Sequence, residues 1–146
     1  MARMVNVGDK DAVKRVATAK GRLTLKKSTL RAIEALKIEK GDVVSASKIA
    51  GIQAAKATST TLPLCHQIPL TSVRVNIEIG EEDLTATCEV EAFYKTGVEM
   101  EALVGVATAL LNAWDMVKYL EKDPRGQYPG TAIKEIRVVS KVKAGD

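Results

Sequence analysis

The residue best suited to acid–base chemistry is His66, the only histidine of the chain, which lies in the segment 61–70, TLPLCHQIPL. The two prolines of this segment fix their own φ angles and favour an extended conformation at the residues before them. The segment is therefore expected to be a stiff loop that presents Leu64, Cys65 and His66 in a defined geometry. A histidine suits proton transfer, although a lone histidine is as often a structural hydrogen-bonding residue.

Cys65 is a poor candidate for a nucleophile activated by His66, because adjacent residues of an extended segment point to opposite sides. A zinc site is disfavoured as well. The chain has one histidine and two cysteines, with no close pair at ligand spacing, so we expect no protein-bound metal. His66 is then interpreted as a lone acid, base or hydrogen-bond donor.

The longest helix is predicted from an apolar segment that runs to about Lys122. A second group of candidate residues, polar or small, interrupts this segment. Its members recur at helical steps and share about a third of the helix circumference. They are Glu101, Gly105, Thr108, Asn112, Asp115 and Lys122. Asp115 also has Lys118 as a neighbour three residues on. This pair is either an ordinary surface ion pair or, in a cleft, an acid–base and phosphate-binding pair.

Lys40 comes just before a predicted helix over residues 43–57, for which Asp42 is the expected N-cap. Free N–H groups and the helix dipole favour an anion at such a position. The net charge of +4 and the pI near 9.1 also favour an anionic partner. The strands offer only Phe93 and Tyr94 for stacking on bases, so a small phosphorylated molecule is favoured over RNA.

The periodicity of the chain predicts strands and helices in the order strand, two helices, two strands, long helix, strand. The predicted strands are 15–25, 73–79, 84–94 and 133–142, and the helices are 28–36, 43–57 and the long helix opened by a Thr96–Glu99 capping box. This order predicts a single α+β domain over residues 1–146 with a ferredoxin-like fold. Its four-stranded, largely antiparallel sheet has helices packed on one face. Residues 1–13 and 141–146 are expected to be mobile.

Apolar positions within these elements predict the core. Ser28 is expected to cap the first helix, with Leu30, Ile33 and Leu36 on its inner face. The second helix is expected to bury Val44, Ile49 and Ile52, the hairpin to bury Cys88, and the last strand to carry Ile136 and Val138 on one face. No apolar run approaches the ~20 residues needed to cross a membrane. Two distant cysteines are typical of reduced thiols in a cytoplasmic protein.

Five blocks of the sequence together resemble a known family. In order they read KGDV, IAGIQAAK, LPLCHQIPL, KTGVEMEAL and WDMVK, within about residues 4–122. The resemblance is to the molybdenum cofactor biosynthesis protein C family. It implies a ferredoxin-like subunit in a homohexamer, a trimer of dimers with its sites at a dimer interface. It also implies a lyase that converts 3',8-cyclo-7,8-dihydroguanosine triphosphate to cyclic pyranopterin monophosphate with release of pyrophosphate.

The resemblance also implies roles for individual residues. The implied catalytic residues are Asp115, Lys118, Lys40 and His66, and the implied substrate-binding residues are Leu64, Cys65, His66, Met100, Glu101, Arg15 and Lys56. It implies no tightly bound cofactor, with any Mg²⁺ arriving on the substrate phosphates. No nucleic acid or membrane partner is expected. The tail departs from the family pattern, with Lys141 and Lys143 where paired glycines are usual.

Two other functions fit the residues without the resemblance. One is a noncatalytic domain that binds RNA or nucleotides on its sheet, with a salt-sensitive affinity. The other is a structural oligomer in which the polar residues of the long helix form hydrogen bonds between chains. The ordered sequence blocks favour the enzyme over both.

Overall fold

The computed structural model describes residues 1–144 as one antiparallel sheet with helices packed against it. The elements in chain order are β1 (Val13–Thr24), α1 (Lys27–Glu34), α2 (Val43–Lys56), α3 (Thr58–Thr61), β2 (Leu70–Ile79), β3 (Asp83–Tyr94), α4 (Glu99–Glu121) and β4 (Ala132–Lys143). The strand order is β2-β3-β1-β4, and each neighbouring pair is antiparallel. The predicted ferredoxin-like α+β fold is therefore confirmed.

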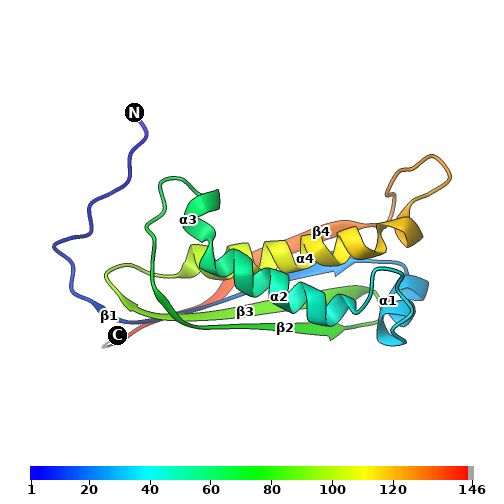
Figure 1. Cartoon of the computed structure of the whole chain (residues 1–146), viewed down its shortest axis with the longest axis horizontal. Helices are drawn as coiled ribbons and strands as arrows, with labels where there is room; N and C mark the ends of the chain where they lie inside the picture. Colours follow the sequence, from blue (N-terminus) through cyan, green and yellow to red (C-terminus); the bar gives the residue numbers. More distant parts are fainter. Residues whose placement is uncertain (145–146) are drawn as a thin grey trace.

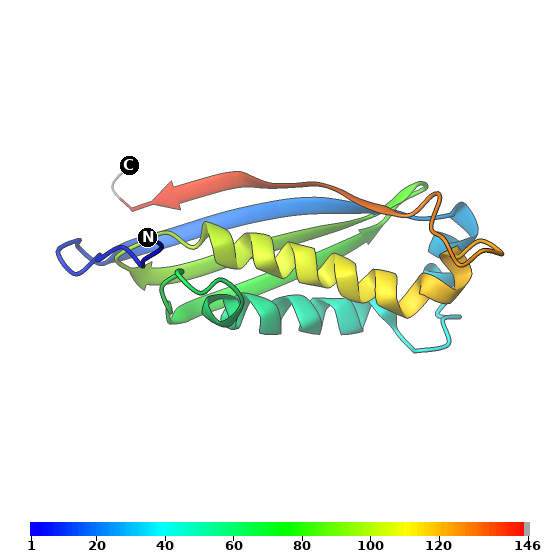
Figure 2. The ribbon, with the colours of Figure 1, turned by 90° about the horizontal axis from the view of Figure 1, so that it is seen from above.

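The sheet and the helices form two layers, with α2 and α4 side by side on one face of the sheet (Figures 1 and 2). The alternation in the sequence produces this arrangement, because every second residue of a strand points to the same face. In β1 and β3 the residues that face the helices are almost completely buried, among them Ala19, Leu23, Leu84 and Val90. Cys88 is buried with them, as predicted.

Two glycines allow α2 and α4 to pack closely. A Cβ atom on Gly51 would lie 2.9 Å from the backbone oxygen of Gly105, closer than real Cβ atoms approach. A Cβ atom on Gly105 would lie 2.7 Å from Sγ of Cys88 in the sheet. Because α4 has no side chain at Gly105, this turn of the helix lies close both to α2 and to the sheet. Gly51 thus permits the close approach of the two helices, and Gly105 permits the close approach of α4 to the sheet.

A buried carboxylate holds together three segments at the end of α4. Oε2 of Glu121 accepts hydrogen bonds from the backbone N–H of Lys26 at 3.1 Å and from Oγ1 of Thr29 at 2.5 Å. Oε1 accepts a hydrogen bond from Oγ1 of Thr131 at 2.7 Å. Glu121 thus connects the start of α1 and the start of β4 to the last turn of α4, at the right-hand end of Figure 1.

This carboxylate explains why the predicted cap of α1 is wrong. Helix α1 begins at Lys27, one residue before Ser28, and its N-cap residue Lys26 makes no side-chain cap. The backbone N–H of Lys26 is instead bound by Glu121 from another helix. Leu36 is also not part of the inner face, because α1 ends at Glu34 and Leu36 follows in an exposed turn with φ of 57°.

Other local predictions have mixed outcomes. The Asp42 cap of α2 is confirmed, since its carboxylate accepts a hydrogen bond from the N–H of Ser45 at 3.1 Å. Ile49 is wrongly assigned to the core and is 58% exposed. The Thr96–Glu99 capping box is also wrong, because α4 begins at Glu99 without a side-chain cap. The Glu99 carboxylate instead pairs with Lys141 at 3.4 Å.

The last strand is longer and less regular than the pattern indicates. Strand β4 continues through Lys141 to Lys143, while residues 145–146 of the predicted mobile tail lie outside the described residues. Its pairing with β1 shifts register twice, and Glu135 near one shift has φ of 57°. Ile136 is half-buried but Val138 is exposed, so the predicted shared inner face holds for only one of them.

Helix α4 is 23 residues long and has a mean hydropathy of 1.2 over 18 residues, enough to cross a membrane by length and composition. This contradicts the expectation that no apolar run approaches the length needed to cross a membrane. The fold gives another reason for the apolar character, since half of that window is buried against the sheet and α2. Such burial is typical of the core helix of a soluble protein.

Candidate active site

Three of the predicted catalytic residues meet at the C-terminal end of α4. Nζ of Lys40 lies 3.0 Å from Oδ2 of Asp115, and Nζ of Lys118 lies 3.1 Å from Oδ1 of the same carboxylate. Lys40 also donates to the backbone oxygen of Asp115 at 3.4 Å. The carboxylate therefore has one ammonium group on each oxygen. About half of each side chain is exposed, so all three groups are accessible to a ligand.

Lys40 reaches this cluster from the turn that joins α1 and α2. The turn closes with a hydrogen bond from the N–H of Gly41 to the oxygen of Ile38 at 3.0 Å. Gly41 has φ of 119°, a conformation that favours glycine. The N–H of Glu39 donates to the hydroxyl oxygen of Tyr119 on α4 at 2.9 Å. Sequence analysis missed Tyr119, which lies one helical turn beyond Asp115.

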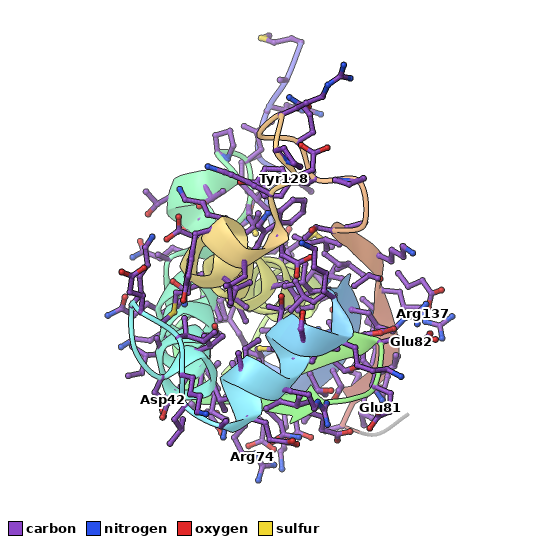
Figure 3. The ribbon with its side chains drawn as sticks, turned by 90° about the vertical axis from the view of Figure 1, so that its right-hand side faces the viewer. Asp42, Arg74, Glu81, Glu82, Tyr128 and Arg137 are labelled. Carbon is purple, nitrogen blue, oxygen red and sulfur yellow. The ribbon has the colours of Figure 1, made fainter. Side chains whose placement is uncertain are left out.

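The connector between α4 and β4 packs back on the same end of the molecule. The ring of Tyr128 meets the ring of Trp114 edge-on, with centroids 5.3 Å apart. Figure 3 views this end, with the end of α4 between Asp42 at the start of α2 and Tyr128 on the connector. Trp114 precedes Asp115 directly, so the connector supports the helical turn that carries the carboxylate.

The electrostatics of this cluster keep Asp115 ionised. The hydrogen bond from Lys40 lowers the pKa of the Asp115 carboxyl below its usual value, and the hydrogen bond from Lys118 acts in the same direction. An ionised carboxylate accepts protons and hydrogen bonds but has no proton to give. Asp115 is thus suited to act as a base, and the two lysines are suited to bind phosphate oxygens.

A second group of predicted residues lies near the N-terminal end of α4. Glu101 is only 3% exposed, and its Oε2 lies 3.9 Å from Sγ of Cys65 in the histidine loop. Burial raises the pKa of the Cys65 thiol, and the negative charge of Glu101 raises it further. Cys65 therefore stays a neutral thiol, which agrees with the prediction that it is not an activated nucleophile.

Glu101 itself is an incompletely bonded carboxyl group. Within residues 1–144, its Oε1 atom is buried without a hydrogen-bond partner. Burial raises the pKa of Glu101, its own backbone N–H acts in the opposite direction, and the negative charge of nearby Glu99 adds to the rise. A buried acceptor without a donor costs stability unless a ligand supplies the donor. Glu101 is therefore suited to bind N–H groups of a ligand.

We predict that Glu101→Gln stabilises the free protein by about 1 kcal/mol at pH 7. Because the pKa of Glu101 is raised in the folded protein, this carboxyl group ionises at lower pH in the unfolded chain than in the folded one. The free energy of unfolding therefore decreases as the pH rises above the ordinary pKa of 4.5. The neutral amide avoids that loss. Denaturant unfolding at several pH values should show an advantage for the variant that shrinks below pH 4.5. An advantage independent of pH would contradict this account.

His66 is bound by the N-terminal segment instead of by another side chain. Its Nε2 atom lies 2.6 Å from the carbonyl oxygen of Val5. Nζ of Lys95 donates to the carbonyl oxygen of Gly8 at 3.1 Å. Residues before β1 otherwise run outward from the two layers (Figure 1). His66 and Cys65 therefore have different partners. The expected extended conformation is wrong at Cys65, because residues 62–65 form a turn in which the N–H of Cys65 donates to the oxygen of Leu62 at 3.1 Å.

The remaining predicted substrate-binding residues differ in their exposure and contacts. Arg15 is 6% exposed and donates from its guanidinium to the backbone oxygen of Lys95 at 3.4 Å. Lys56 is exposed and lines a hollow of about 320 Å³ between α2 and the start of β2. Leu64 and Met100 are exposed apolar side chains.

Within one chain, the cluster around Asp115 and the group around Glu101 lie far apart. Glu101 and Asp115 are 14 positions apart on one straight element, and at 1.5 Å per residue this is about 21 Å. The structure thus brings Lys40, Asp115 and Lys118 together, and it places Cys65 beside Glu101. It does not bring Asp115 near His66, although both are predicted catalytic residues.

The fold and these groups define a class of protein, a ferredoxin-like α+β domain whose helix α4 carries an acid–base cluster at each end. The comparison with known proteins is more specific. This chain belongs to the MoaC family, whose family model matches residues 4–144. The resemblance found in the sequence blocks is therefore confirmed over nearly the whole chain.

Curated relatives agree with this assignment. A protein of Thermococcus kodakarensis is 59% identical over 141 residues, which cover 97% of this chain and 90% of the relative. A protein of Archaeoglobus fulgidus is 52% identical, covering 98% and 92%, and one of Sulfurisphaera tokodaii is 51% identical, covering 99% and 96%. Each of these relatives is named a probable cyclic pyranopterin monophosphate synthase.

Proposed function

We propose that this protein is a cyclic pyranopterin monophosphate synthase of molybdenum cofactor biosynthesis. It converts 3',8-cyclo-7,8-dihydroguanosine triphosphate to cyclic pyranopterin monophosphate and releases pyrophosphate, as a lyase of the cytoplasm. The relatives of this name span nearly the whole chain. The observation that carries the proposal in the structure is the accessible carboxylate of Asp115 between the ammonium groups of Lys40 and Lys118.

This cluster fits the phosphate end of the reaction. The substrate carries three phosphates, and pyrophosphate leaves as negative charge accumulates on its oxygens. Lys40 and Lys118 stabilise that charge, and each can turn from Asp115 to a phosphate oxygen because all three side chains are exposed. Asp115 takes protons during ring opening and closure of the cyclic phosphate. Mg²⁺ bound to the phosphates belongs to the substrate, and the protein needs no tightly bound cofactor for these roles.

The opposite end of α4 fits the guanine-derived ring. The unpartnered Oε1 of Glu101 accepts hydrogen bonds from ring N–H groups, which compensates its burial. His66 exchanges protons with the ring, and Arg15 and Lys56 provide positive charge nearby. Leu64, Cys65 and Met100 supply apolar surface for the flat ring. The protein binds this small nucleotide-derived molecule and no nucleic acid.

A complete site then needs two subunits. About 21 Å of helix separates Glu101 from Asp115 in one chain, more than one compact cyclised nucleotide can bridge. A two-fold axis that sets α4 of one subunit antiparallel to α4 of its partner brings the cluster of one chain to the ring-binding end of the other. We infer a dimer with two such sites and, from the family, a hexamer built as a trimer of dimers.

Mixing two inactive variants tests the shared site. We predict that Asp115→Asn and His66→Ala proteins are each inactive, and that their denatured and co-refolded mixture regains about a quarter of the wild-type turnover. In an equal mixture half of the dimers contain one chain of each variant, and each such dimer has one intact site out of two. A quarter of all sites are therefore intact. The assay measures pyranopterin formed from the cyclised dihydro-GTP substrate.

The outcomes of this experiment distinguish the proposed sharing of the site between chains from the proposed reaction. Recovery of activity supports a site shared between chains. A fully inactive mixture that still forms mixed dimers shows that the residues do not act across an interface. A folded wild-type protein without any turnover of this substrate rejects the proposed reaction itself.

A further inference from the structure

The position of Lys40 depends on how its turn is held to α4. Lys40 lies outside any helix or strand, between α1 and α2. On one side of it the side chain of Ile38 is buried, and beyond it Asp42 caps α2. Lys40 itself contacts α4 through its side chain, and the backbone of the turn is held to α4 by the preceding residue, Glu39, whose N–H donates to the hydroxyl oxygen of Tyr119 at 2.9 Å.

We propose that the hydroxyl group of Tyr119 is a positioning group for catalysis, which holds the turn 38–41 so that Lys40 stays on Asp115. This inference rests on the proposed function. Tyr119 follows Asp115 by four residues and so lies on the same face of α4. Its hydroxyl and the Asp115 carboxylate thus bind two successive residues of one turn, Glu39 by its N–H and Lys40 by its ammonium group.

Lys118 provides an internal contrast. It reaches Asp115 from within α4, and helix geometry alone sets that approach. Lys40 reaches the same carboxylate from a separate segment, and its backbone must be held at the correct distance. Loss of the Tyr119 hydroxyl therefore loosens the contact of Lys40 but leaves the contact of Lys118. The role is one of positioning, since Tyr119 acts through Lys40.

Tyr119→Phe tests the proposal because it removes one oxygen atom from a side chain that is 42% exposed and leaves the ring in place. We expect kcat to fall about 10-fold or more, since misplacement of a catalytic group is costly, with little change in stability. The pKa of Asp115 should rise toward its ordinary value, because Lys40 is the larger of the two influences that lower it. Selectively ¹³C-labelled aspartate measures this pKa by NMR in the free enzyme.

Tyr128→Phe is the matched control. Its ring packs on Trp114 at the same end of α4, and its hydroxyl makes no hydrogen bond within residues 1–144. This variant should keep both kcat and the pKa of Asp115. In a Lys40→Ala background, Tyr119→Phe should have no further effect on either quantity, because the two changes act on one contact.

Three results would overturn the inference. The first is an unchanged Asp115 pKa and an unchanged kcat in Tyr119→Phe. The second is an equal loss of kcat in the presence and absence of Lys40, which would mean that Tyr119 acts without it. The third is an equal effect of Tyr128→Phe. The NMR measurement needs no substrate, so it tests the coupling of Tyr119 to Lys40 and Asp115 even if the proposed reaction fails.

Discussion

Replacement of Asp115 by asparagine is expected to lower kcat for pyranopterin formation by about 10² to 10⁴-fold, the usual contribution of a general acid or base. The amide keeps the size of the side chain but cannot take a proton. Asp115 is about half exposed, and within residues 1–144 its carboxylate pairs only with the half-exposed ammonium groups of Lys40 and Lys118, so the fold should be unaffected. Turnover of the cyclised dihydro-GTP substrate, with circular dichroism and light scattering as checks of folding and assembly, measures the effect.

Asp42→Asn is the control for this variant. It makes the same change of charge two residues from Lys40, and asparagine caps a helix as well as aspartate does. Its turnover should stay near that of the wild type. Similar losses in both variants would mean that the net charge of this region matters instead of the Asp115 carboxylate. Full activity of Asp115→Asn would move the catalytic role to another residue.

The largest effect on stability is expected from Gly51→Val, which should lower the free energy of unfolding by about 3 kcal/mol. The first added atom already lies 2.9 Å from the backbone oxygen of Gly105 and 3.1 Å from Cγ2 of Val75. Backbone cannot rotate away as a flexible side chain can, so α2 must move outward from α4. Denaturant unfolding followed by circular dichroism measures the loss.

Gln53→Val on the exposed face of α2 controls for the poor helix propensity of valine. Its cost should stay below about 1 kcal/mol. If Gly51→Val were no less stable than this control, the two helices would not be as close as the structure describes. A large difference between the variants supports the close packing at Gly51 and Gly105.

Local chemistry allowed much of the fold to be predicted from the sequence. Alternating residues defined β2 and β3, because burial of one face of a sheet leaves a period of two. Asp42 was identified as a cap because a cap needs only its own helix. Part of the cluster at Asp115 was also predicted from local spacing along one helix. Its partner Lys118 is a neighbour on the helix, whereas Lys40 was linked to it by family resemblance.

The features that were missed depend on contacts between distant parts of the chain. Ser28 has the residue type of a cap, but Glu121 binds the start of α1 from 95 positions away. Tyr119 contacts Glu39 across 80 positions, and its spacing from Asp115 alone gives no sign of that contact. Ile49 fits a helical apolar pattern, yet it is exposed because the sheet and α4 cover only part of α2. Periodicity identifies a face of a helix but not what covers it.

The contact between His66 and the N-terminal segment has a consequence for the tautomer of the imidazole. A backbone carbonyl has no proton to donate, so the 2.6 Å contact requires the proton to be on Nε2, which donates to Val5. The lone pair of the neutral ring is then on Nδ1. A proton accepted by His66 therefore binds at Nδ1, and the positive charge that results strengthens the hydrogen bond from Nε2. The carbonyl of one N-terminal residue thus determines which nitrogen of the only imidazole can accept a proton.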